Sequence, residues 1–104
     1  MEKDNNKSIS IQTYMELLQG AKNKKQHKII KDFITDFNFT TLPLTQNIGH
    51  RALIYVQEYA LSYNLWAADA LIAATAIENN LPLYSSNAEH FGCIENLDLN
   101  VFKP

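Results

Sequence analysis

Residues 65–77 read LWAADALIAATAI, a nearly all-apolar stretch. Its apolar character is broken only by Asp69 and Thr75, and the stretch is longer than most strands. We therefore predict a helix that is buried on most of its sides. The asparagines at 79–80 end this helix, and the short apolar segment 81–84 predicts a buried parallel strand.

The sequence on either side of this helix alternates between extended and helical patterns. Extended patterns predict three more strands, over residues 8–12, 38–44 and 97–102. Helical spacing predicts helices over residues 13–21, 23–37 and 45–64. Strands separated by helices of this length indicate an α/β fold, in which helices flank a parallel sheet. We expect one domain at residues 8–104, after a disordered leader at residues 1–7.

Composition excludes several classes of protein. The chain has 104 residues, of which 46% are hydrophobic and 19% charged, so it should bury one core rather than remain disordered. The single cysteine, Cys93, excludes a disulfide framework and a cysteine-based zinc site. No apolar run is long enough to span a membrane, and residues 1–8 lack the apolar stretch of a signal peptide. We therefore expect a cytoplasmic protein that does not associate with membranes.

Charge is distributed unevenly along the chain. Up to Lys31 there are seven lysines and three acidic residues, whereas the remainder holds two basic and eight acidic residues. One interpretation is a surface that contacts phosphate groups beside an acidic metal-binding centre. The other interpretation is a lysine-rich helix face that is simply solvated.

Asp69 is the most informative residue, because a carboxylate inside an apolar helix is costly unless another group pairs with it. It can be a structural acid in the first helical turn, where the helix dipole favours negative charge. It can also be a ligand of a hard cation or a general base. The polar run Ser85-Ser86-Asn87 favours this second interpretation, because sites collect at the carboxyl ends of parallel strands. Asp69 and Asn87 would then open onto one edge of the sheet.

Other polar residues have structural explanations on spacing alone. Thr13 and Glu16 form a capping-box pattern, and Ser86 and Glu89 form another. The three histidines show no metal-ligand spacing, and His90 is expected to be a surface or capping residue. The sequence contains no glycine-rich phosphate loop, no nucleophile elbow and no zinc signature.

Three segments together resemble the PIN-domain family. Residues 9–20, ISIQTYMELLQG, resemble the segment with the second acidic residue of that family, at Glu16. Residues 68–76, ADALIAATA, resemble the segment with the third, at Asp69. Residues 81–91, LPLYSSNAEHF, resemble the strand and turn with the fourth position, at Asn87. The likeness covers about residues 8–102 and is greatest to VapC-type toxins.

VapC-type toxins are Mg²⁺-dependent endoribonucleases that an antitoxin neutralises. The resemblance therefore implies hydrolysis of RNA phosphodiester bonds, with Asp69, Glu16 and Asn87 as the catalytic residues. Asp69 and Glu16 would hold Mg²⁺ or Mn²⁺ through their carboxylate oxygens. The metal would activate a water molecule and stabilise charge on the phosphate. A VapB-type antitoxin is the implied partner.

The N-terminal part of the sequence departs from the family pattern. The family opens with an apolar strand that ends in an acidic residue, whereas Asp4-Asn5-Asn6 follows no apolar strand. We therefore expect an N-terminally truncated PIN-like fold with weakened metal binding, because Mg²⁺ relies on few, well-placed protein ligands. Open strand edges favour a homodimer or a strand-exchanged oligomer. The function is then either an impaired endoribonuclease or a catalytically inactive module that binds itself, an antitoxin or RNA.

Overall fold

The computed structural model describes residues 7–86 and 88–102, which form two compact units. The first unit ends at Pro43 and the second begins at Leu44. Each unit combines helices with two parallel strands, so the predicted α/β class with parallel strand pairing is confirmed. The strands are only three residues long and form two separate two-stranded sheets, one in each unit.

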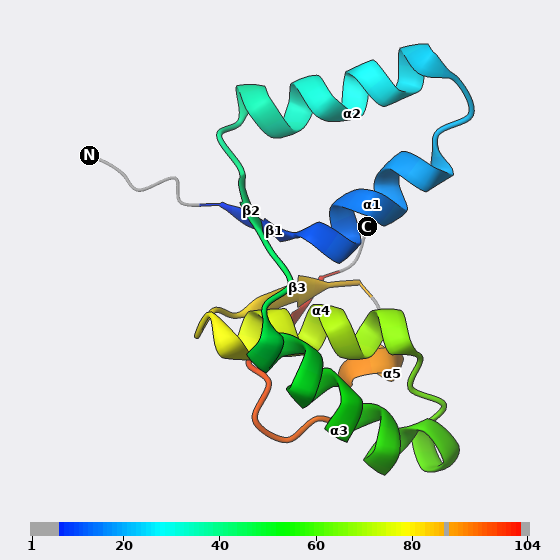
Figure 1. Cartoon of the computed structure of the whole chain (residues 1–104), viewed down its shortest axis with the longest axis vertical. Helices are drawn as coiled ribbons and strands as arrows, with labels where there is room; N and C mark the ends of the chain where they lie inside the picture. Colours follow the sequence, from blue (N-terminus) through cyan, green and yellow to red (C-terminus); the bar gives the residue numbers. More distant parts are fainter. Residues whose placement is uncertain (1–6, 87, 103–104) are drawn as a thin grey trace. The chain divides into compact units, whose positions relative to one another are not determined.

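The first unit is a parallel strand pair with two helices between its strands. Strand β1 (Ser8–Ser10) pairs with β2 (Thr40–Leu42), and helices α1 (Ile11–Gly20) and α2 (Lys24–Asp36) form a hairpin between them (Figure 1). The expected leader at residues 1–7 lies outside the described residues except for Lys7. The Lys7 carbonyl accepts a hydrogen bond from the Thr40 N–H at 2.8 Å and so extends the strand pairing by one bond.

The start of α1 corrects one sequence-based expectation. The helix begins at Ile11, and Ser10 is its N-cap, since the Ser10 hydroxyl accepts a hydrogen bond from the Thr13 N–H at 3.0 Å. Thr13 therefore lies inside the helix, and the predicted capping box of Thr13 and Glu16 is wrong. Ser10 and Thr13 are both good capping residues, and the serine that ends the short strand β1 takes the role.

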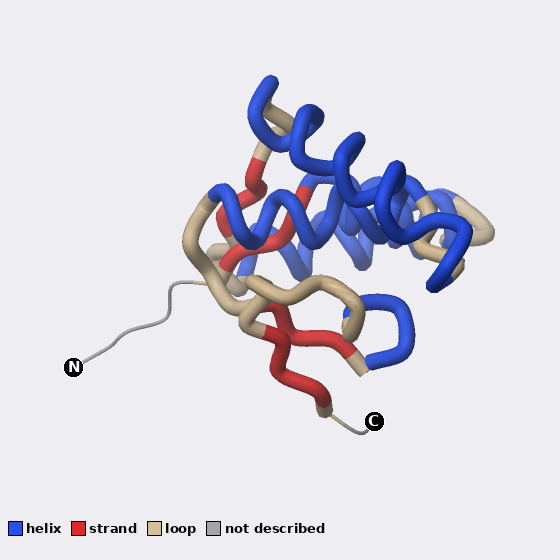
Figure 2. The backbone as a smooth tube through the Cα atoms, turned by 90° about the horizontal axis from the view of Figure 1, so that it is seen from below, coloured by secondary structure: helices blue, strands red, loops and turns tan. Residues whose placement is uncertain are grey.

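The second unit contains three helices and two strands. Helix α3 (Gln46–Tyr63) and helix α4 (Ala67–Glu78) precede strand β3 (Leu83–Ser85), the short helix α5 (Ala88–Phe91) and strand β4 (Leu99–Val101). Strands β3 and β4 lie side by side and run parallel (Figure 2). The helix predicted at 45–64 is confirmed, with Thr45 as its N-cap.

The core of the second unit lies where α3 and α4 pack together. Three alanines of α4 have no exposed surface, and their small side chains let α3 approach closely: Ala70, Ala73 and Ala74. The core also contains Ile48, Ala52, Tyr55, Leu65, Ala76, Phe91, Ile94 and Leu97. This confirms that the apolar stretch at 65–77 forms a largely buried helix.

Three helices are followed by asparagines in the left-handed backbone region. Asn38, Asn64 and Asn80 have φ of 55°, 56° and 56°, and no other non-glycine residue in the described ranges has a positive φ. Asparagine adopts this conformation more readily than most residues. After α4, the Leu81 N–H donates to the Ala76 carbonyl at 2.9 Å, which closes the helix and directs the chain toward β3.

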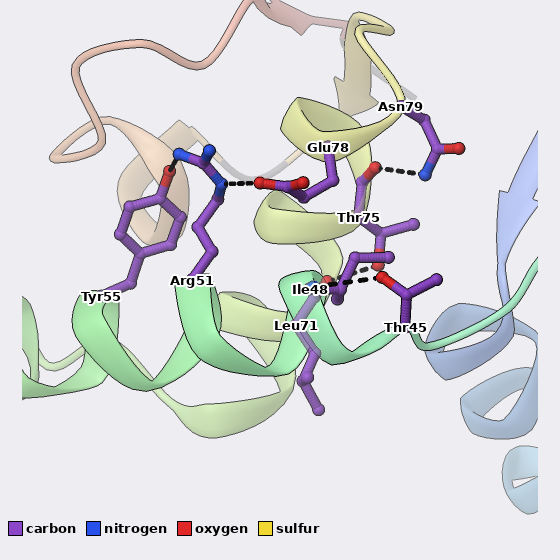
Figure 3. Close-up of polar contacts among 8 residues, drawn as sticks. All are labelled: Thr45, Ile48, Arg51, Tyr55, Leu71, Thr75, Glu78 and Asn79. Atoms are coloured by element: carbon purple, nitrogen blue, oxygen red, sulfur yellow. Dashed lines mark hydrogen bonds and ion pairs between the residues drawn. The ribbon is translucent and has the colours of Figure 1, made fainter.

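A polar network joins α3 to α4 at the end of the core. Arg51 Nε donates to Glu78 Oε2 at 2.5 Å, and Arg51 Nη1 donates to the Tyr55 hydroxyl at 3.4 Å (Figure 3). The hydrogen bonds to Tyr55 and to Glu78 raise the pKa of the Arg51 guanidinium above its ordinary value. Because Glu78 is 21% exposed, this pair is better shielded from water than an ordinary surface ion pair.

We expect Glu78→Ala to lower the free energy of unfolding by about 1 kcal/mol, because Arg51 loses its partner while it stays partly in water. Urea unfolding followed by circular dichroism measures this change. Asp32→Ala is the matched control, because it removes the exposed Lys28–Asp32 pair within α2 and should have no measurable effect. Equal losses in the two variants would show that the interhelical pair has no special role.

Candidate functional site

Asp69 lies in the first turn of α4, where both sequence interpretations placed it. The N-cap of α4 is Trp66, whose side chain makes no capping hydrogen bond. The negative charge of Asp69 therefore interacts with the positive end of the helix dipole without competition from a capping side chain. The Asp69 side chain is 17% exposed, so it is shielded but open to solvent.

His90 is the side chain that contacts the Asp69 carboxylate among the described residues. Its Nδ1 atom lies 3.3 Å from Asp69 Oδ2, and its side chain is 47% exposed. The sequence treated His90 as a surface or capping residue and missed this contact. A signal was present, because His90 closely follows the strand end that was expected to face Asp69. The contact brings α5 to the N-terminal end of α4.

Asn87 lies outside the described residues, so its predicted role stays a prediction. Its described neighbours are Ser86 and the helix α5, which follow strand β3. Ser86 is exposed, and His90 of α5 contacts Asp69. Among the described residues that follow β3, His90 therefore places helix α5 beside the first turn of α4.

Glu16 belongs to the first unit and lies on α1. Its side chain is exposed, and Gln12 Nε2 donates to Glu16 Oε2 at 3.4 Å. Glu16 also lines a groove of about 440 Å³ between α1 and α2, together with Leu17, Ile29 and Ile30. Without a capping role, Glu16 has carboxylate oxygens that are open to a ligand. Its predicted meeting with Asp69 stays a prediction.

The carboxylate oxygens of Asp69 and Glu16 are of the type that hard cations bind. Mg²⁺ and Mn²⁺ prefer oxygen ligands, which the Asp69 and Glu16 carboxylates supply. Over residues 7–86 and 88–102, no three His, Cys, Asp or Glu side chains come together as a ready metal site.

Two further findings concern the Cys93 thiol and the length of the apolar helices. Burial raises the pKa of the Cys93 thiol, which disfavours the thiolate that a cysteine nucleophile requires. No helix in the described part of the chain is both long and apolar enough to cross a membrane.

Comparison with protein families decides what kind of domain this is. The family model described as "PIN domain" matches residues 1–92. The chain belongs to the PIN domain family. The resemblance seen in the sequence, on segments around Glu16, Asp69 and Asn87, is thereby confirmed at the level of the family.

The relatives of this PIN domain include proteins of toxin–antitoxin systems. Ribonuclease VapC1 of Methanocaldococcus jannaschii is 28% identical over 102 residues, which cover 98% of this chain and 74% of that protein. A toxin–antitoxin complex from Klebsiella pneumoniae contains a chain with 28% identity and a TM-score of 0.76, over 94% of this chain and 75% of that chain. These similarities support a PIN domain of the VapC type.

A more distant structure shares the fold. VapBC-5 of Mycobacterium tuberculosis, from the VapBC family of toxin–antitoxin systems, is 17% identical with a TM-score of 0.64. The match covers 91% of this chain and 79% of that chain. The PIN-like arrangement of helices and parallel strands expected from the sequence is therefore confirmed.

Proposed function

We propose that this PIN domain is a VapC-type endoribonuclease that hydrolyses RNA phosphodiester bonds. The observation that carries the proposal is the shielded Asp69 carboxylate at the N-terminus of α4, in a chain that belongs to the PIN domain family. The name of the relative Ribonuclease VapC1 supports the choice of RNA as the substrate. We also propose that cleavage takes place in the cytoplasm.

Asp69 and Glu16 would hold Mg²⁺ or Mn²⁺, and Asn87 would add a neutral carbonyl oxygen. When bound, the metal supplies activation of water and stabilisation of charge on the phosphate. Asp69 contributes a carboxylate whose negative charge the dipole of α4 favours. Glu16 contributes a second carboxylate from an exposed position on α1. Two acids hold Mg²⁺ loosely, so we propose that this chain alone is impaired in cleavage.

The chain alone should therefore bind RNA but cleave it poorly. The lysines of α2 attract the phosphate backbone, whereas weak metal binding limits hydrolysis. The assay follows an end-labelled RNA on a denaturing gel with Mg²⁺ or with EDTA. It compares the chain with a version that has an apolar strand ending in aspartate ahead of Ser8. We expect faster Mg²⁺-dependent cleavage by the extended version.

Asp69→Asn is the control for this assay and should abolish cleavage in both versions. Strong cleavage by the original chain that disappears in Asp69→Asn would refute the impairment but support the site. Cleavage that survives Asp69→Asn would contradict the proposed site. Absence of Mg²⁺-dependent cleavage in both versions would favour the second candidate function.

The second candidate is a catalytically inactive interaction module, and the groove in the first unit favours it. Large apolar side chains remain exposed on α1 and α2: Met15, Leu17, Ile29, Phe33 and Phe37. Exposed lysines accompany them on α2. We propose a VapB-type antitoxin segment as the occupant, with apolar side chains for the groove and acidic side chains for the lysines. The toxin–antitoxin complexes among the structural neighbours support this choice.

A homodimer or strand-exchanged oligomer also belongs to this proposal. Among the described residues, β1 and β2 form a two-stranded sheet in the first unit, and a second copy could pair with an outer edge of this sheet. Helix α3 adds exposed apolar side chains at Leu53 and Tyr63. Light scattering at micromolar concentration tests the association, and a monomer at every concentration would contradict it.

A further inference from the structure

Trp66 is the sole tryptophan of the chain and stands at an unusual position. It is the N-cap of α4, where serine, threonine, aspartate and asparagine are preferred because their side chains bond to free backbone N–H groups. The Trp66 side chain makes no such bond. The residue therefore does not stabilise the start of this helix in the usual way.

Trp66 also does not contribute its side chain to the core. Its exposed fraction is 66%, whereas the preceding Leu65 is 3% exposed and packs in the core of the second unit. Leu65 thus anchors the segment between α3 and α4, and Trp66 presents its indole to solvent. Burial of a tryptophan normally stabilises a fold, so a position that departs from both capping and burial preferences points to a role in function.

Trp66 is close in the chain to the proposed site. Asp69 follows three residues later, in the first turn of the same helix, and His90 contacts Asp69 from α5. Trp66 is the N-cap of α4 and Asp69 is the third residue of the helix, so both residues belong to the N-terminal end of α4. An RNA phosphate bound at this end of the helix would therefore bring an adjacent base within reach of the indole ring.

We propose that Trp66 is a stacking platform for an unpaired nucleobase of the RNA next to the phosphate at Asp69. Single-stranded RNA is commonly bound through bases that stack on exposed aromatic side chains, because every base has a π face. This inference rests on the proposed function, since it takes RNA as the ligand. It adds a base-binding subsite to a site that otherwise contains only groups for metal and phosphate.

The test uses the full chain with Asp69→Asn, so that RNA is not cleaved during the measurement. A short, end-labelled single-stranded RNA is titrated in, and binding is followed by fluorescence anisotropy of the label and by the emission of Trp66. We expect RNA binding to quench Trp66 emission. In the same background, Trp66→Ala should weaken binding about tenfold, whereas Trp66→Phe should largely retain it.

Two controls separate stacking from other effects. Leu61→Ala removes an apolar side chain of α3 that is fully exposed, and it should leave RNA affinity unchanged. An RNA of the same length without bases keeps the phosphate contacts, and it should not quench Trp66.

Three results would overturn the inference. In the first, anisotropy reports RNA binding, but Trp66 emission does not change and Trp66→Ala binds RNA with unchanged affinity. This result would refute stacking and leave the proposed function intact. Quenching by the base-free RNA would assign the signal to the backbone and also refute stacking. No RNA binding by anisotropy would refute the proposed function and the inference with it.

Discussion

Ile48→Ala should lower the free energy of unfolding by about 3 kcal/mol, within the range usual for truncation of a buried isoleucine. Ile48 is 1% exposed and lies in the first turns of α3, where it belongs to the core cluster with α4. The neighbouring alanines of α4 are already small and fully buried, so they cannot refill the space. Loss of this side chain therefore leaves a cavity between the two helices.

Urea unfolding measures this loss, with Ile54→Ala as the matched control. Ile54 lies on the same helix and is 49% exposed, so its truncation should change the free energy of unfolding by no more than about 0.5 kcal/mol. If both variants lost similar stability, the core described for the second unit would be wrong. The slope of the transition should stay unchanged, because neither variant alters the surface that unfolding exposes.

The helices of the second unit could be predicted because several signals agree there. Thr45 is a strong N-cap, Ile48 begins an apolar stripe, and Asn64 ends the helix in the left-handed region. The start of α1 could not be predicted, because Ser10 and Thr13 are both suitable caps and the extended pattern of residues 8–12 overlaps the first turn. Local preference does not choose between two nearby caps.

Helix α2 shows a second limit of sequence patterns. Its apolar positions recur with helical spacing, and the helix forms between Lys24 and Asp36 as expected. Yet only Ile34 is buried, whereas Ile29 and Phe33 are 58% and 49% exposed. The period of the pattern shows which side chains share a face of the helix. How much of that face is buried depends on contacts with residues that are distant in the sequence.

The site was predictable only in part. Asp69 could be found because a carboxylate stands out in an apolar helix, and both its place in the first turn and its contact with His90 are observed. His90 was missed because its contact with Asp69 joins two elements separated by β3. The capping box predicted for Glu16 is wrong, and its role as a metal ligand stays a prediction. Asn87 lies outside the described residues and also keeps its role as a prediction.

Binding of Mn²⁺ tests whether Asp69 belongs to a metal-dependent site, because Mn²⁺ takes the same oxygen ligands as Mg²⁺ and free Mn²⁺ gives a strong electron paramagnetic resonance signal. We expect wild-type chain to bind the ion weakly. Asp69→Asn should weaken binding at least about tenfold, because it removes a charged ligand, and Glu16→Gln should weaken binding as well. Asp32→Asn, which changes an exposed acid of α2, should bind as wild type does. Unchanged affinity in Asp69→Asn would contradict the assignment of a metal-dependent site to Asp69.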